Sequence, residues 1–245
     1  MWITSGFVAL TLVTLVLPAV GEGGFSPARQ VSADVLVLVS VGLLFHGLLS
    51  LWENLSTPAI LILGTVAVAL CLPAAFLSRP EALTEEPAIL RLLALLLADA
   101  FRLLASAALA YALARHVTSV GVVLLIAGVA TASDLFSVFA GPTRALVRED
   151  SPALDFLLLI FPTFGQPAGF ALGVSDFIFL ALFAATSRLL NLRYPLTLAA
   201  GLAATLLAMV CGLILERPLP ALPFISISFV IANANLLLAA LRKLR

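Results

Sequence analysis

The stretch GFALGVSDFIFLALF, residues 169–183, decides the fold, because it places the charged residue Asp176 among apolar and small residues. A second stretch, GVATASDLFSVFAG at residues 128–141, does the same with Asp134. Carboxylates are costly at membrane depth, so an aspartate inside an apolar span usually belongs to a functional site. Two such aspartates predict carboxyl chemistry inside the bilayer.

Composition places these stretches in a membrane protein. Of the 245 residues, 62% are hydrophobic and 11% are charged, whereas a soluble domain carries roughly 25% charged residues to cover its surface. The 13 basic and 13 acidic residues cancel, and no run of like charge points to a nucleic-acid partner. We therefore expect an integral, multi-pass protein embedded in a lipid bilayer, in the plasma or inner membrane of a prokaryote.

Eight helical spans are predicted from the rule that roughly 20 apolar residues cross the hydrocarbon core. They cover residues 2–20, 31–51, 58–77, 88–114, 117–140, 167–186, 195–215 and 220–240. The connections are short, which predicts a single all-α membrane domain over residues 1–245, with N-terminal helices in 1–115 and the aspartate-bearing helices in 116–245. No basic residue precedes the first apolar run, which favours a retained helix over a cleaved signal peptide.

The connection between the fifth and sixth predicted spans differs from the others. Its apolar stretch, residues 156–161, is too short to cross the membrane and is bounded by prolines. A strand, a re-entrant piece and an interfacial helix all fit this length, and periodicity does not decide between them.

The positions of the two aspartates in their predicted spans bring them to one depth. Asp134 lies six residues before the end of the fifth span and Asp176 about nine residues after the start of the sixth. At 1.5 Å per residue, both lie roughly 9–14 Å from the same membrane face. Two carboxyls that meet about 3 Å apart share one proton, so that one serves as base and the other as acid.

The motifs GVSDFIF (173–179) and LPALPFISI (219–227) resemble those of the presenilin and signal peptide peptidase family of intramembrane aspartyl proteases. Gly173 and Asp176 match the family's GxGD motif, while Ser175 stands where its second glycine is expected. The PAL motif is intact at Pro220, Ala221 and Leu222. Ser133 precedes Asp134 in place of the usual tyrosine, and the resemblance covers residues 131–233.

The resemblance implies a presenilin-like helical bundle with Asp134 and Asp176 as catalytic residues and with transmembrane helical proteins as substrates. It also implies that substrate pairs as an added β-strand with the segment between the catalytic helices, and that the PAL motif shapes the site. The substrate-binding residues expected on this basis are Leu157, Leu158, Leu159, Ile160, Gly173, Pro220, Ala221, Leu222 and Pro223. No cofactor or metal is expected.

Three other functions remain open. A prepilin-type peptidase also uses two aspartates, but its pattern lacks the proline motif. A transporter or channel would use Asp134 and Asp176 for proton or ion passage. An inactive relative would bind transmembrane helices without cutting them, which the departures at Ser133 and Ser175 allow.

The remaining polar residues of the spans fit structural roles. Asp99 and Arg102 are three residues apart in the fourth span, a spacing that lets them form an ion pair. Asn233 is expected to donate hydrogen bonds between helices. Cys71 and Cys211 are interpreted as small core residues.

Overall fold

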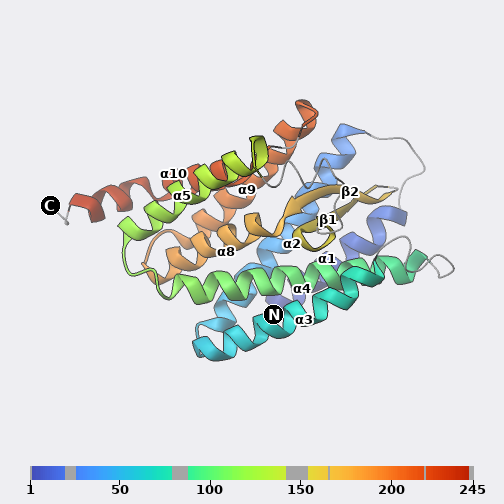
Figure 1. Ribbon diagram of the computed structural model, residues 1–245, viewed down its shortest axis with the longest axis horizontal. Coiled ribbons are helices and arrows are strands. Elements are labelled where there is room, and N and C mark those ends of the chain that lie inside the picture. Colours follow the sequence, from blue (N-terminus) through green and yellow to red (C-terminus); the bar gives the residue numbers. More distant parts are fainter. Residues whose placement is uncertain are drawn as a thin grey trace. The chain divides into compact units, whose positions relative to one another are not determined.

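The computed structural model describes residues 2–19, 26–78, 88–141, 154–164, 166–217 and 219–242 (Figure 1). The chain divides into two compact units. One contains residues 1–109 and 152–177, and the other contains residues 110–151 and 178–245. Residues 152–177, which include Asp176, therefore pack with the N-terminal part of the chain.

Six helices in the described part of the chain are long and apolar enough to cross a membrane. They are α2 (Pro27–Trp52), α3 (Thr57–Leu77), α4 (Ala88–Ala114), α5 (Val120–Phe139), α9 (Tyr194–Ile214) and α10 (Leu222–Arg242). Two predicted spans contain shorter helices, α1 (Trp2–Val16), followed by the 3-10 turn η1 (Leu17–Ala19), and α8 (Val174–Leu189). The prediction of a mainly helical, multi-pass membrane protein is confirmed at this level.

Local sequence explains where several helices begin. Pro27, Pro58 and Pro195 lie in the first turns of α2, α3 and α9, where a missing backbone N–H removes no helical hydrogen bond. Ser119 caps α5 by accepting a hydrogen bond of 3.4 Å from the Val122 backbone N–H. The connections at 20–25, 79–87 and 142–153 lie outside the described residues.

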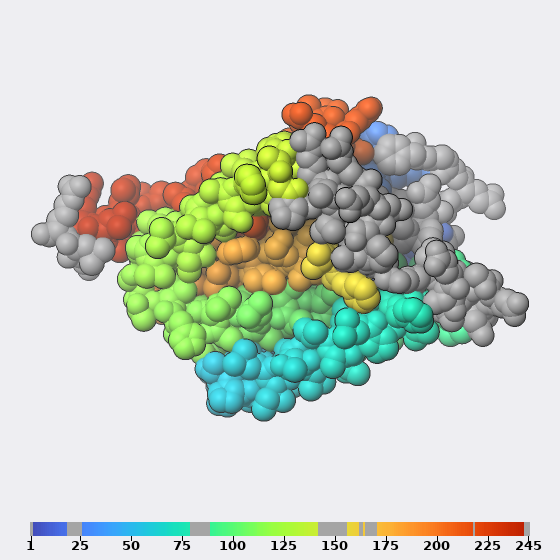
Figure 2. All heavy atoms as spheres, viewed as in Figure 1, coloured from blue at the N-terminus to red at the C-terminus, as the bar shows by residue number. Residues whose placement is uncertain are grey.

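Small residues set the helix packing in the first unit. A Cβ atom on Gly6 would lie 2.5 Å from the Leu44 backbone nitrogen, and one on Gly47 would lie 2.6 Å from the nitrogen of Ile3. Only glycine allows α1 and α2 to approach this closely. Helices α3 and α4 lie side by side (Figure 2). The buried cluster between them contains Cys71, Ala74, Ala75 and Ala98.

Two antiparallel strands come directly before α8. The short helix α7 (Leu154–Leu157) leads into β1 (Leu158–Thr163), which pairs with β2 (Gln166–Gly173). Leu159 and Phe161 are buried, as is Leu172 opposite Leu159, which is the alternation of a strand with one covered face. Of the three interpretations of residues 156–161, the structure shows a strand for residues 158–161, while residues 156–157 belong to α7.

Strand β2 corrects the sixth predicted span, which was expected to be helical from residue 167. Residues 166–173 have the sequence QPAGFALG, and its proline and two glycines disfavour a helix. This segment pairs with β1 instead. Helix α8 consequently begins at Val174, and Asp176 lies in its first turn.

An aromatic cluster holds the hairpin in the first unit. The ring of Phe177 packs edge-on against Phe161 of β1, with centroids 5.9 Å apart, and against Phe45 of α2, with centroids 6.4 Å apart. All three side chains are buried. Because Phe177 follows Asp176 directly, this cluster also fixes the start of α8.

A hydrogen-bond network joins three helices of the second unit. Asn233 of α10 donates from Nδ2 to Thr197 Oγ1 of α9 at 2.8 Å, and Ser187 of α8 donates to the same oxygen at 3.0 Å. The Asn233 Oδ1 accepts from the Arg193 backbone N–H at 2.9 Å. The expected packing role of Asn233 is confirmed, since its amide connects α10 with α9.

Candidate active site

Asp134 lies in the last third of α5, where its carboxylate contacts the start of α10. Its Oδ2 accepts a hydrogen bond of 3.0 Å from the Leu222 backbone N–H, across 88 residues of sequence. Leu222 is the first residue of α10. The first N–H groups of a helix have no partner within it and carry the positive end of the helix dipole. The second unit therefore pairs an intramembrane carboxylate with a helix N-terminus.

The PAL motif supplies this N-terminus. Ala221 and Leu222 are buried, and Pro223 occupies the second position of α10, where its lack of an N–H costs no helical bond. One turn further on, the Ser226 hydroxyl donates to the Ala127 carbonyl of α5 at 3.4 Å. Two polar contacts, Leu222–Asp134 and Ser226–Ala127, therefore hold α10 against α5.

Asp176 occupies the junction between β2 and α8 in the first unit. It is the third residue of α8, and 8% of its surface is exposed. Gly173 lies against it: a Cβ atom at this position would lie 3.1 Å from the Ser175 Oγ and 3.3 Å from the Asp176 Oδ2. Because Gly173 has no side chain, there is room beside it for the Asp176 carboxyl.

Asp134 and Asp176 belong to different units, so their direct pairing stays a prediction. One premise of the equal-depth argument is wrong. Asp176 is not about nine residues into a long helix, because residues 166–173 form β2 and α8 starts at Val174. Counting helical rise from residue 167 therefore does not give the depth of Asp176.

The structure places the predicted substrate-binding residues at three points. Leu157 ends α7 and is 51% exposed, whereas Leu158, Leu159 and Ile160 lie in β1. In the register, Leu158 faces Gly173, Leu159 faces Leu172 and Ile160 faces Ala171. Gly173 lies beside Asp176 in the first unit, and residues 220–223 lie at the start of α10 in the second.

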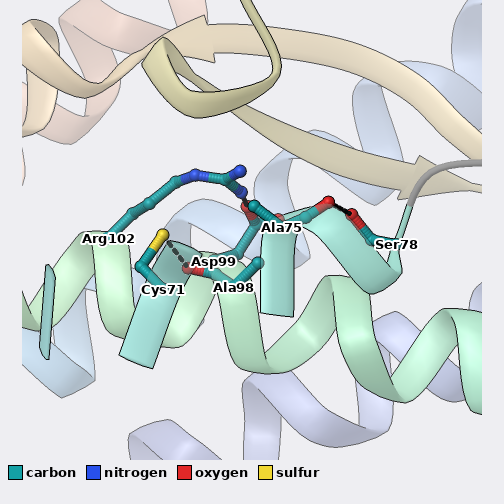
Figure 3. A network of polar contacts seen from close by, with 6 residues as sticks. All are labelled: Cys71, Ala75, Ser78, Ala98, Asp99 and Arg102. Carbon is teal, nitrogen blue, oxygen red and sulfur yellow. Dashed lines mark hydrogen bonds and ion pairs between the residues drawn. The ribbon is translucent and has the colours of Figure 1, made fainter. Parts of the chain in front are cut away.

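The predicted Asp99–Arg102 ion pair is present in α4 (Figure 3). Arg102 Nη1 lies 2.5 Å from Asp99 Oδ1, and both residues are buried. A third partner, which residue spacing does not indicate, comes from the strand: the Ile160 backbone N–H of β1 donates to the Asp99 carboxylate. The ion pair therefore joins α4 to the hairpin.

A further intramembrane carboxyl, Asp34 of α2, was not singled out in the sequence. It accepts a hydrogen bond of 2.8 Å from Gln30 Nε2, and both residues are 3% exposed. The signal for this pair was its spacing, since residues four apart face each other on a helix. Asp34 has an amide from its own helix as its partner, whereas Asp134 has a backbone N–H from another helix.

No protein-family model and no curated protein matches this chain. The functional argument therefore depends on the motifs and on the contacts of their residues.

Proposed function

We propose that this protein is an intramembrane aspartyl protease with a presenilin-like helical bundle. It would hydrolyse peptide bonds within transmembrane segments of membrane proteins or within remnant signal peptides. The observation that carries the proposal is the hydrogen bond from Leu222 N–H to Asp134 Oδ2, because it joins an intramembrane carboxylate to the Pro-Ala-Leu sequence. Asp134, the first of the two predicted catalytic aspartates, thus contacts the PAL motif that the family resemblance rests on.

In the proposed mechanism, Asp134 and Asp176 share one proton and hold a water between them. The ionised carboxyl takes a proton from the water, and the water oxygen attacks the scissile carbonyl carbon. The protonated carboxyl gives its proton to the carbonyl oxygen. A gem-diol results. The carboxyls then exchange roles, because one protonates the amide nitrogen while the other accepts a hydroxyl proton. The C–N bond breaks, and the shared proton is restored.

We assign substrate holding to the hairpin of β1 and β2 and to residues 220–223 at the start of α10. A transmembrane helix has to unwind before its peptide bonds can be attacked, and pairing with a strand replaces the backbone hydrogen bonds lost on unwinding. The hairpin of β1 and β2 leads without a loop into Val174 and Asp176. An extended peptide bound near its end would therefore lie close to the Asp176 carboxyl.

The test is cleavage of a single-span membrane substrate by the purified protein in detergent or lipid. Asp134→Asn and Asp176→Asn should each lower kcat by about a thousandfold, because a single carboxyl cannot serve as acid and base together. Asp34→Asn is the matched control. It changes another buried aspartate of a span, keeps an acceptor oxygen for Gln30, and should leave cleavage unchanged.

Near-normal cleavage by either dyad variant would show that the assignment is wrong. The rival functions give different patterns in the same preparation. A transporter or channel would show ion flux in the wild type and none in Asp134→Asn or Asp176→Asn. Neither the wild type nor the variants would release a cleaved substrate. An inactive relative would retain a labelled transmembrane helix without cutting it, and a prepilin-type peptidase would cut only prepilin leader peptides.

A further inference from the structure

A two-stranded hairpin has two outer edges, and at the outer edge of β1 the Asp99 carboxylate of α4 contacts the backbone. In antiparallel pairs, successive residues direct their N–H and C=O groups alternately toward the partner strand and away from it. The Ile160 N–H is bound by Asp99 of α4, so Ile160 is directed away from β2. By the same alternation Leu158 is directed outward, while Leu159 and Phe161 are directed toward β2; the pairing is irregular between Phe161 and Thr163.

Two residues of β1, Ile160 and Pro162, have no backbone N–H available to another strand. The N–H of Ile160 is used by Asp99, and Pro162 has no N–H to offer. In proteins generally, a proline in the strand or a neighbouring helix that covers the edge protects it from pairing with another chain. β1 has Pro162, and Asp99 of the neighbouring helix α4 covers the Ile160 N–H.

The Asp99 acceptor is itself held in place. Arg102 Nη1 contacts Asp99 Oδ1 at 2.5 Å, and the two residues are 4% and 5% exposed. Figure 3 shows both side chains extending from α4 toward the strands. An added strand would have to displace the Ile160–Asp99 bond and disturb a buried ion pair, whose disruption is strongly unfavourable.

We propose that Asp99 and Arg102 close the outer edge of β1, so that an extended peptide is excluded from this edge of the hairpin. If the protein is the protease proposed above, the pair determines where substrate is held. Its role is positional, since it acts through β1. With this edge closed, substrate would not add as a strand to the outer edge of the stretch formed by Leu157, Leu158, Leu159 and Ile160, where the family resemblance placed it.

The first test measures amide hydrogen exchange of Ile160 by NMR, in detergent-solubilised protein labelled with ¹⁵N-isoleucine. Two double variants are compared. Asp99→Asn with Arg102→Gln removes both charges but keeps an acceptor oxygen, whereas Asp99→Leu with Arg102→Leu removes the acceptor as well. The Ile160 amide should be protected in the wild type and the amide variant, and should exchange about fivefold to tenfold faster in the leucine variant.

The second test asks whether a strand can add. With Cys71 and Cys211 replaced by alanine, a single cysteine at Leu158→Cys reports on the outer edge. The probe is a synthetic seven-residue peptide of alternating valine and threonine with a central cysteine. Disulfide cross-linking should be weak in the wild-type and amide backgrounds, and about fivefold stronger when both Asp99 and Arg102 are leucine.

The outcomes separate the two proposals. Fast exchange of the Ile160 amide in the wild type would overturn edge closure even if the leucine variant failed to fold. So would equal cross-linking in all three backgrounds. Neither readout involves peptide-bond hydrolysis, so absence of proteolysis would remove the proposed function and leave edge closure standing.

Discussion

Asp134 and Asp176 both lie in apolar helices, but different kinds of structure position them. Asp134 is held by a contact between helices, from the Leu222 N–H at the start of α10. Asp176 is positioned by its own stretch of chain, through the end of β2, the gap at Gly173 and the neighbouring Phe177 cluster. The first site therefore depends on how α10 packs on α5, and the second depends on the register of the hairpin.

The largest effect is expected from a substitution that disrupts the hairpin preceding Asp176. Leu159→Pro removes an N–H directed toward β2 and a fully buried leucine, and should lower stability by about 3 kcal/mol or more. Leu158→Pro is the matched control. Leu158 is the first residue of β1, with its N–H directed outward, and proline is tolerated at that place in a strand. Thermal unfolding in detergent and substrate cleavage measure both effects.

If Leu158→Pro were as damaging as Leu159→Pro, the alternation assigned to β1 would be wrong. Should both proteins unfold and cleave as the wild type does, the hairpin would contribute nothing to positioning Asp176.

The next effect concerns the contact that holds Asp134. Asp134→Ala leaves the Leu222 N–H without its acceptor and should cost about 1–2 kcal/mol of stability, as the loss of a helix cap does. Asp134→Asn keeps an oxygen for this bond and should change stability little. Both should abolish cleavage, because neither retains a carboxyl. Equal stability of the two variants, measured by thermal unfolding, would show that the Asp134–Leu222 bond contributes no stability.

The sequence predicted the second unit better than the hairpin, for physical reasons. Long apolar runs between turn formers define α5, α9 and α10, because span length is fixed by the bilayer. Residues 167–173 are also apolar, so hydropathy extended the sixth span across them. The proline and glycines that disfavour a helix over residues 167–173 are local signals, but the pairing with β1 is not. The acceptors of Leu222 N–H and Ile160 N–H, which are Asp134 and Asp99, depend on tertiary contacts that residue spacing does not encode.

A smaller effect is expected at Gly173. In Gly173→Ala the new Cβ would lie 3.3 Å from Asp176 Oδ2 and 3.1 Å from Ser175 Oγ, so the carboxyl has to shift by a few tenths of an ångström. We expect a loss of about 1 kcal/mol in stability and about tenfold in kcat/KM. Gly128→Ala in α5 is the control, because its Cβ would have no neighbour within 4 Å. It should be neutral or slightly stabilising. Similar losses in both variants would mean that crowding at Asp176 is not the cause.

The smallest effect tests the departure from the family motif. Ser175 is exposed and its Oγ is the atom nearest to the Cβ that Gly173→Ala would introduce. Ser175→Gly alone should change stability by less than about 0.5 kcal/mol and leave cleavage unchanged or raised. In the Gly173→Ala background it removes one of the two close contacts, so the double variant should recover part of the lost kcat/KM. A double-mutant cycle measures this coupling. Additive losses would show that Asp176 alone feels the added methyl, and a strong loss in Ser175→Gly would assign the hydroxyl a role at the carboxyl.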